Sequence, residues 1–172
     1  MSFSIVEIIR HLWSPNHELS CSWLLWHRII YRLQQHGNFV RESGAFLLGK
    51  RNNRGRSRIV NFVLYDDIDP HCLDSGIVCI YGSYFGTLWE ICQRSHLTVV
   101  ADVHTHPGNS MQSQSDRDNP MIAQKGHLAI ILPRFAKPPV RLNEVGIYRY
   151  RGGKRWHTIP SEQRSSFFHI GL

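Results

Sequence analysis

Between residues 22 and 35, apolar and polar positions follow the period of an α-helix that packs one face on a sheet. Apolar residues occupy the i, i+3, i+4 and i+7 positions of this segment: Trp26, Ile29, Ile30 and Leu33. Gly37 and Asn38 follow as a stop signal, because both residue types tolerate the backbone conformation that ends a helix. We therefore predict an amphipathic helix over Ser22–Gln35.

A second helix is predicted over Ser83–Ser95 on the same grounds. Its expected buried stripe contains four residues: Phe85, Leu88, Trp89 and Cys92. A shorter helix is predicted nearer the N-terminus, over Ile5–Trp13, and Ser14-Pro15-Asn16 marks a break after it.

Short apolar runs rich in β-branched residues, bounded by glycine, proline and polar clusters, predict strands. They are Ala45–Gly49, Ile59–Tyr65, Leu97–Val103, His127–Leu132, Val145–Tyr150 and Arg155–Ile159. Hairpin turns join the first two strands through Lys50–Arg58 and the last two about Gly152-Gly153. Strands that alternate with helices indicate an α/β domain, with a mixed, curved β-sheet flanked by helices. His127 is typical of a hydrogen-bonded sheet histidine rather than of a metal ligand.

The chain has 172 residues, 42% of them hydrophobic, which suffices for one well-cored domain and is too little for two. We predict an N-terminal extension over residues 1–20, the domain over 21–160 and a C-terminal tail over 161–172. The tail ends in apolar residues that typically pack on their own domain, with docking to a partner as the alternative. Trp13, Trp23 and Trp26 are expected in the core rather than on a docking face.

No run of the sequence approaches the roughly 20 apolar residues of a membrane span. The N-terminus lacks a basic segment followed by an apolar core, so no secretory signal is expected and the protein is predicted to be cytoplasmic. The cysteines show no Cys-x-x-Cys pairing and are expected to be reduced, mostly buried thiols. They are Cys21, Cys72, Cys79 and Cys92.

The strand predicted over Leu97–Val103 runs directly into His104-Thr105-His106-Pro107. Side chains at i and i+2 leave a strand on the same face, so His104 and His106 can turn toward one ion. A Ser-x-x-Asp unit follows at Ser113–Asp116, and its first and last residues share one helical face. Two imidazoles and one carboxylate, with a fourth position left to water, are the usual ligands of a hydrolytic zinc site.

Each of these motifs taken singly has a simpler explanation. A His-x-His pair is commonly a surface or capping pair, and Ser-x-x-Asp is commonly a helix N-cap. A third candidate, Glu42, lies just ahead of the strand predicted over Ala45–Gly49, and by itself it would be a solvated carboxylate beside Arg41. The combination of all three in this order favours a metal site.

The two downstream motifs resemble those of the JAMM (MPN+) zinc metalloprotease family, which cleaves peptide or isopeptide bonds at ubiquitin-like proteins. That family also carries an upstream glutamate in a glycine- and leucine-containing segment at the start of a strand. Here Glu42-Ser43-Gly44-Ala45-Phe46-Leu47-Leu48-Gly49 occupies that place. The resemblance covers roughly residues 20 to 150 and is closest to compact prokaryotic-type members. It implies a cytidine-deaminase-like α/β fold.

The spacing departs from the family in one respect. The family has six residues between the proline and the serine, whereas five separate Pro107 from Ser113. An alternative register ends at Asp118 and is one residue longer than usual. We favour Ser113 and Asp116, because the other register would put Arg117 directly beside the metal carboxylate, and Asp118 stays as the alternative.

By this resemblance the metal is Zn²⁺ and its ligands are His104, His106 and Asp116. Glu42 is the implied general base, and Ser113 is the implied donor to the tetrahedral intermediate. The implied activity is that of a zinc-dependent isopeptidase or peptidase, which cleaves after the C-terminal tail of a ubiquitin-like protein in deconjugation or precursor processing. The implied partners are that protein and its conjugates, with neighbouring activating or conjugating enzymes as further candidates and no membrane.

Three alternatives stay open. The first is a processing protease for a sulfur-carrier protein of ubiquitin fold, and the second is a non-catalytic MPN scaffold. The third is a nucleic-acid-binding relative, because the RadC family has a similar motif and the net charge is +7. The basic residues concentrate in Lys50–Arg58 and Arg149–Arg155, however, away from the metal motif and with the composition of solvated turns. A nucleic acid is therefore not the expected partner, although a basic rim for an acidic protein is compatible with these turns.

Overall fold

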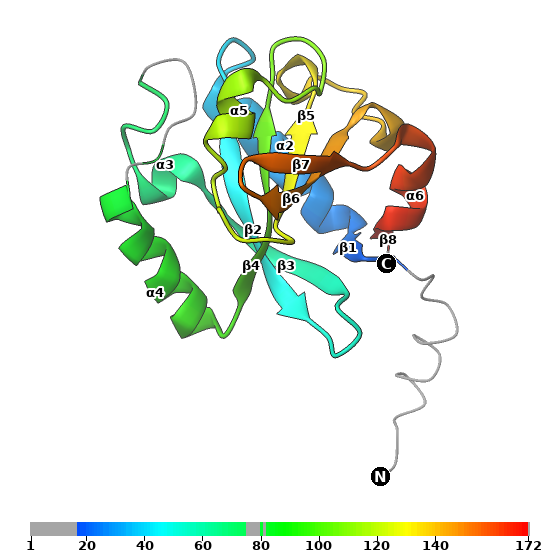
Figure 1. The fold of residues 1–172 in the computed structure, drawn as a ribbon. Helices are drawn as coiled ribbons and strands as arrows, with labels where there is room; N and C mark the ends of the chain where they lie inside the picture. The colour runs from blue at the N-terminus through cyan, green and yellow to red at the C-terminus, as the bar shows by residue number, and fades with distance from the viewer. Residues whose placement is uncertain (1–16, 75–79, 81, 172) are drawn as a thin grey trace.

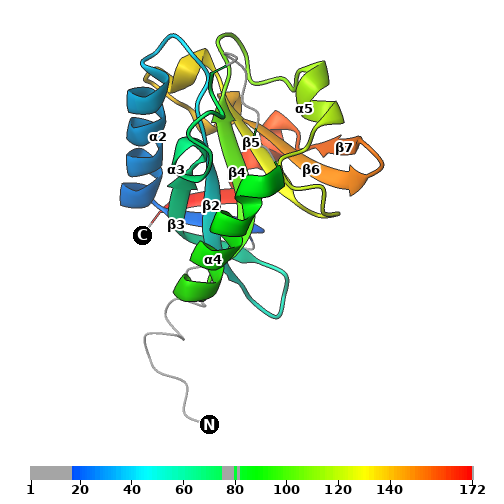
Figure 2. The ribbon, with the colours of Figure 1, turned by 90° about the vertical axis from the view of Figure 1, so that its left-hand side faces the viewer.

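The computed structural model describes residues 17–74, 80 and 82–171, which form a mixed β-sheet with helices on both faces (Figures 1 and 2). The strand order is β7-β6-β5-β4-β2-β3-β1-β8. β1 pairs in parallel with β3 and β8, β4 pairs in parallel with β5, and the other neighbours are antiparallel. This curled eight-stranded sheet confirms the predicted α/β class.

The elements have the following bounds. The strands are β1 (Leu19–Ser22), β2 (Gly44–Arg51), β3 (Ser57–Leu64), β4 (Thr98–Thr105), β5 (Leu128–Leu132), β6 (Gly146–Gly152), β7 (Arg155–Thr158) and β8 (Phe168–Gly171). The α-helices are α2 (Trp23–Gly37), α3 (Tyr65–Ile68), α4 (Phe85–Ser95), α5 (Gln114–Asp118) and α6 (Arg164–Phe167). Single 3₁₀ turns lie at Gly82–Tyr84, Arg134–Ala136, Leu142–Glu144 and Ser161–Gln163. Among the described residues, no helix has the length and apolar character needed to cross a membrane.

Helix α2 forms where the sequence predicts it. The Ser22 hydroxyl caps its N-terminus by accepting a hydrogen bond from the Leu25 amide at 3.3 Å. Asn38 ends it in the left-handed conformation with a φ of 48°. Three of the four predicted face residues are fully buried and the fourth, Ile30, packs at the edge of the core.

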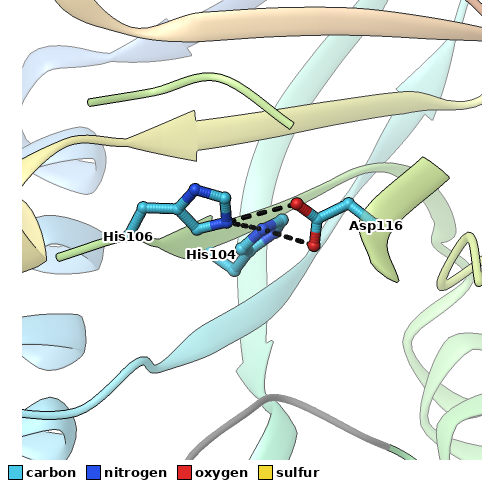
Figure 3. A group of neighbouring side chains, drawn as sticks. All are labelled: His104, His106 and Asp116. Carbon is cyan, nitrogen blue, oxygen red and sulfur yellow. Dashed lines mark hydrogen bonds and ion pairs between the residues drawn. The ribbon is translucent and has the colours of Figure 1, made fainter. Parts of the chain in front are cut away.

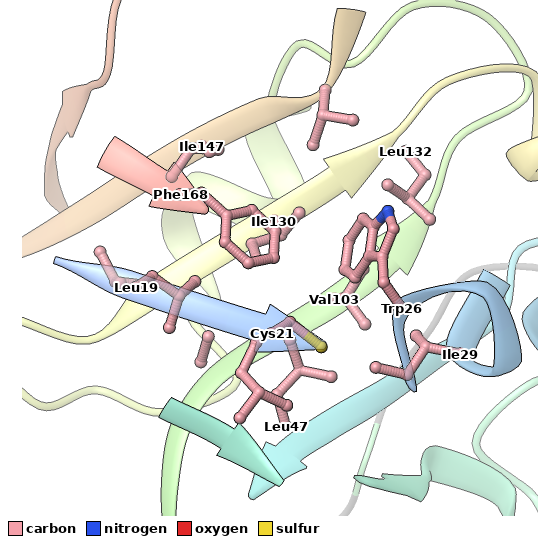
Figure 4. Packing of buried hydrophobic residues seen from close by; sticks show 14 of the residues in the cluster. Leu19, Cys21, Trp26, Ile29, Leu47, Val103, Ile130, Leu132, Ile147 and Phe168 are labelled. Atoms are coloured by element: carbon pink, nitrogen blue, oxygen red, sulfur yellow. The ribbon is translucent and has the colours of Figure 1, made fainter. Parts of the chain in front are cut away.

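The larger core lies between α2 and one face of the sheet (Figure 4). The Trp26 ring meets Phe168 edge to face, with 5.1 Å between the ring centroids. Val103 of β4 points into this core. Because alternate residues of a strand point to opposite faces, Asp102 and His104 project to the other side of the sheet.

The second face of the sheet is covered by α3 and α4, which bury Phe46 and Tyr65 in a smaller core. The prediction that Trp89 belongs to the buried stripe of α4 is wrong, since its side chain is 48% exposed. Only Leu88 and Cys92, one turn apart, are buried on this helix. Trp89 is turned by about 100° from Leu88 around the helix axis, so it misses the sheet.

Strand β1 begins in the predicted N-terminal extension (residues 1–20), and strand β8 lies in the predicted C-terminal tail (residues 161–172). β8 pairs in parallel with β1, with Phe168 beside Leu19, and Phe168 is fully buried. The apolar tail therefore packs on its own domain, as predicted. Four-residue strands are too short to show an alternating pattern, and this pair depends on a contact between the two ends of the chain. The boundaries at residues 20 and 160 stay a prediction, although β1 spans the first.

The tryptophans near the N-terminus differ in their environment. Trp26 lies in the core as predicted, whereas Trp23 is 53% exposed, so its prediction is wrong. The Trp23 ring packs against His27 one turn further along, and therefore covers the surface of α2 instead of the sheet. Trp13 and the helix predicted over Ile5–Trp13 lie outside the described residues.

Both basic segments form hairpin turns, as predicted. In the β2–β3 turn, the Asn52 side-chain oxygen accepts hydrogen bonds from the amides of Arg54 and Arg56 at 3.0 Å each. The β6–β7 turn uses Gly152 and Gly153 with φ values of 87° and 58°. The basic side chains of these turns therefore project from the ends of two hairpins.

The described cysteines are free and buried, in agreement with the prediction. Burial raises the pKa of the Cys21 and Cys72 thiols to about 12, which keeps them protonated at neutral pH. Cys79 lies outside the described residues.

The packing of β8 predicts the effect of shortening Phe168. Phe168→Ala should lower the free energy of unfolding by about 3–5 kcal/mol, because a fully buried ring is lost and a cavity remains. Leu24→Ala is the matched control, since Leu24 is 74% exposed and its loss should change stability by less than about 0.5 kcal/mol. Urea unfolding followed by circular dichroism measures both variants. Equally small losses of unfolding free energy in the two would contradict the packing of the tail on the core.

Candidate metal centre

Strand β4 carries two imidazoles to one end of the sheet. His104 is the last residue but one of this strand and His106 follows its end. Both are buried, at 6% and 8% exposure. Gly44 of β2 pairs with His104 on one side and Ile131 of β5 on the other, so the ring stands on the α3/α4 face between two paired strands.

Asp116 completes the group from α5 (Figure 3). The Nε2 atoms of His104 and His106 are 3.1 Å apart. The Asp116 oxygens Oδ1 and Oδ2 lie 3.4 Å and 3.3 Å from the Nε2 atoms of His104 and His106, respectively. Within the described ranges, these residues form the one group of three or more histidine, cysteine or acidic side chains whose ligand atoms all lie within 4.8 Å of one another.

The donor set fits a divalent metal ion. Two imidazole nitrogens bound to zinc at about 2.0–2.1 Å in tetrahedral geometry would be about 3.3 Å apart, near the 3.1 Å observed. Two neutral imidazoles cannot face each other through their lone pairs at this distance without a proton or a cation between them. The carboxylate beside them supplies the negative charge that a cation needs.

Ser113 sets the direction of Asp116 through a capping box at the start of α5. The Ser113 hydroxyl accepts a hydrogen bond from the Asp116 amide at 3.1 Å, and the Ser113 amide donates to Asp116 Oδ2 at 2.6 Å. The hydroxyl also donates to Oδ2 at 2.8 Å. The helix-cap and ligand interpretations of Ser-x-x-Asp are therefore compatible, because the cap turns the carboxylate toward the histidines.

Asp118, the alternative ligand, faces a different group. Its Oδ1 lies 3.4 Å from the Lys154 ammonium and its Oδ2 accepts a hydrogen bond from Gln114 at 2.9 Å. The structure thus brings Asp116, and not Asp118, to the two histidines.

Glu42 lies just before β2 and next to the group. Its Oε1 is 3.9 Å from His106 Nε2. The following residue, Ser43, is tied to β4 in both directions: its amide donates to Thr105 Oγ1 at 3.0 Å and its carbonyl accepts from the Thr105 amide at 2.9 Å. Ser43 Oγ also donates to the Leu33 carbonyl of α2 at 2.8 Å. Glu42 is therefore held beside the histidines by backbone pairing.

The loop between Pro107 and Ser113 rests on β6. Tyr148 donates a hydrogen bond from its hydroxyl to the Ser110 carbonyl at 2.7 Å. A Cβ at Gly146 would come within 2.2 Å of the same carbonyl oxygen, so only glycine allows this approach. These contacts fix the path of the chain that carries Asp116 back to the histidines.

The charges of this group shift the pKa of its members. Burial lowers the pKa of His104, but the nearby carboxylates of Asp102 and Asp116 outweigh it and raise the pKa to about 9. Burial raises the pKa of Asp116, yet its interactions with His104 and His106 prevail and hold that pKa well below its usual range. The site therefore favours a positive charge next to Asp116, whether a proton or a metal ion.

Sequence reasoning missed a buried carboxylate behind the histidines. Asp102 is 1% exposed, and its oxygens contact His127 and Tyr65. The i, i+2 spacing that links His104 and His106 extends back to Asp102, so the signal was present in the sequence. His127 is hydrogen-bonded within the sheet, as predicted.

Comparison of the sequence with known proteins gives a partial match. No protein-family model matches the chain. A stretch of 65 residues is 32% identical to a protein of Sinorhizobium fredii described as the probable metalloprotease y4jG. This stretch covers 38% of the chain and 40% of the length of that relative. The match therefore joins less than half of each protein.

Comparison with solved structures supports the fold alone. Protein DSY2949 from Desulfitobacterium hafniense superposes with a TM-score of 0.59 at 11% identity, over 83% of this chain and 90% of that one. A protein from Salinibacter ruber gives a TM-score of 0.50 at 13% identity, over 81% and 88% of the two chains. Both likenesses agree with the α/β architecture.

The geometry predicts which aspartate a metal needs. Asp116→Asn should lose stoichiometric metal, because it removes the carboxylate charge beside both histidines. Asp118→Asn should keep the metal, since Asp118 contacts Lys154 and Gln114 instead. Metal content after dialysis against trace zinc, measured by mass spectrometry, distinguishes the two. Loss of metal in the Asp118 variant alone would reverse the assignment.

The raised pKa of His104 predicts that metal binding releases a proton. Below pH 9 the His104 ring holds this proton in the metal-free protein, and a metal ion displaces it. About one proton should leave per ion bound near neutral pH, and affinity should rise as the pH increases toward 9. Calorimetric titration in buffers of different ionisation enthalpy measures the release. A binding enthalpy that does not depend on the buffer would contradict this expectation.

Proposed function

We propose that this protein is a zinc-dependent peptidase or isopeptidase that cleaves after the C-terminal tail of a ubiquitin-like protein. The observation that carries the proposal is the convergence of Glu42 and Ser113 on the group formed by His104, His106 and Asp116. The resemblance to JAMM proteases assigns a role to each of these residues. The partial similarity to a probable metalloprotease points to the same class of chemistry.

A zinc ion bound to this group supplies Lewis acidity and brings the pKa of a water molecule to about 7. Glu42 is the general base: its carboxylate accepts a proton from the attacking water and returns it to the leaving amine. Its distance of 3.9 Å from His106 Nε2 puts it next to the ligands without making it one of them. Asp116 and the two histidines would hold the zinc ion in place before the substrate arrives.

Ser113 donates a hydrogen bond to the oxygen of the tetrahedral intermediate. Its hydroxyl rests on the Asp116 carboxylate, 2.8 Å from Oδ2, and can rotate toward a substrate while its amide keeps the capping contact. A donor of this kind is worth roughly 10²–10³ in kcat when it is aimed at the developing oxyanion.

The proposed substrate class follows from the resemblance and from the exposure of the group. The Glu42 and Asp116 side chains are 19% and 20% exposed, whereas the histidine rings lie deeper. An extended tail would reach such a centre from this partly exposed side, where narrow subsites would select small residues. Glycine at the scissile bond suits such subsites.

The test of the function uses zinc-loaded protein and a ubiquitin-like protein extended past its terminal glycine. Glu42→Gln should keep zinc and lose roughly 10²–10⁴-fold in kcat, because only the proton transfer is removed. Ser113→Ala should lose about 10²–10³-fold. Asp118→Asn serves as the control and should cleave like the wild type.

The outcomes separate the remaining functions. Zinc binding and cleavage of a sulfur-carrier precursor in preference to other ubiquitin-like substrates would favour the processing protease. Zinc-free protein that binds a ubiquitin-like partner without cleaving it would favour the scaffold. Full cleavage by zinc-loaded Glu42→Gln would exclude the proposed mechanism.

A further inference from the structure

The two ring nitrogens of His104 face different surroundings. Its Nε2 faces His106 and Asp116. Its Nδ1 points inward, and among the described residues it has no partner within hydrogen-bond distance. The carboxylate oxygen Oδ2 of Asp102 lies 3.9 Å from this Nδ1. A movement of about 1 Å by either side chain would bring these atoms to hydrogen-bond distance.

Asp102 is held by two buried groups of the sheet and α3. Its Oδ1 accepts a hydrogen bond from His127 Nε2 at 2.5 Å, and its Oδ2 accepts one from the Tyr65 hydroxyl at 3.1 Å. Tyr65 is fully buried, and its ring occupies the space where Gly44 has no side chain: a Cβ there would lie 2.1 Å from the ring. Because Gly44 pairs with His104 in the sheet, this close approach brings the tyrosine directly behind the histidine.

A carboxylate in this position needs an explanation. Asp102 pairs in the sheet with Phe46 and Ala129, both buried apolar residues, so an apolar side chain would suit the site better for stability. A buried charge costs free energy unless it is paired and hydrogen-bonded. Each oxygen of Asp102 has one donor, so Oδ2, which lies 3.9 Å from His104 Nδ1, can accept a second hydrogen bond.

We propose that Asp102 is a positioning residue for the metal site: its carboxylate accepts a hydrogen bond from the Nδ1–H of His104, which keeps the proton on Nδ1 and leaves Nε2 to bind the metal. Tyr65 and His127 fix the carboxylate for this purpose. The inference rests on the metal site of the proposed function and is independent of the peptidase activity. A neutral imidazole carries one proton, and a partner at one nitrogen decides which nitrogen binds a metal.

The experiment measures zinc affinity of the full chain by chelator competition, together with the proton spectrum of the histidine rings in zinc-loaded protein. Asp102→Asn keeps the shape and replaces the acceptor with an amide. It should weaken zinc binding about 10–100-fold and remove the downfield signal of the His104 Nδ1 proton. Tyr65→Phe removes one hydrogen bond to the carboxylate and should weaken binding about two- to ten-fold.

Asp66→Asn is the matched control, because Asp66 also pairs with a histidine, His36, but lies outside the metal group. It should leave both the zinc affinity and the Nδ1 signal unchanged. Unchanged affinity and an unchanged signal in Asp102→Asn would overturn the inference. If that variant does not fold, unchanged affinity in Tyr65→Phe overturns it instead. Failure of the wild type to bind zinc would overturn the metal site itself and this inference with it.

Discussion

β2 and β4 run antiparallel, and their register places Gly44 opposite His104. The site depends on this pairing. It brings Glu42, two residues ahead of Gly44, to the same end of the sheet as the two histidines, and the bonds between Ser43 and Thr105 extend the pairing up to that point. A slip by one residue would turn the histidines into the core behind α2. The apolar side chains that face α2 therefore fix the orientation of the polar ones on the other side.

A second constraint acts on the loop that returns to this end of the sheet. Asp116 is far less buried than the histidines and belongs to a helix of five residues, which packing alone would hold weakly. The capping box compensates for this, since the hydrogen bonds that start the helix also orient the carboxylate. Tyr148 and Gly146 of β6 fix the preceding loop, through a hydrogen bond and a close approach to the Ser110 carbonyl. Local hydrogen bonds thus orient Asp116, whereas strand pairing in the sheet orients His104.

Charge is concentrated where the sheet ends. Three histidines and two aspartates gather there, and each of the histidines, His104, His106 and His127, contacts Asp102 or Asp116. Such a cluster costs free energy unless opposite charges are matched. This matching of opposite charges raises the pKa of His104 and lowers the pKa of Asp116. A metal ion at this position would satisfy the same charges.

The sequence by itself determined the elements with strong local patterns: the helix with Trp26, the two hairpins and the strand that ends in the histidines. It also predicted which residue types would gather as candidate ligands, because the i, i+2 and i, i+3 spacings of strands and helices are local properties. Tertiary structure decided between Asp116 and Asp118, which share the same local pattern but face different neighbours. It alone placed β1 beside β8 and exposed Trp89. These results depend on contacts between residues far apart in the chain, and short segments carry no periodic signal of such contacts.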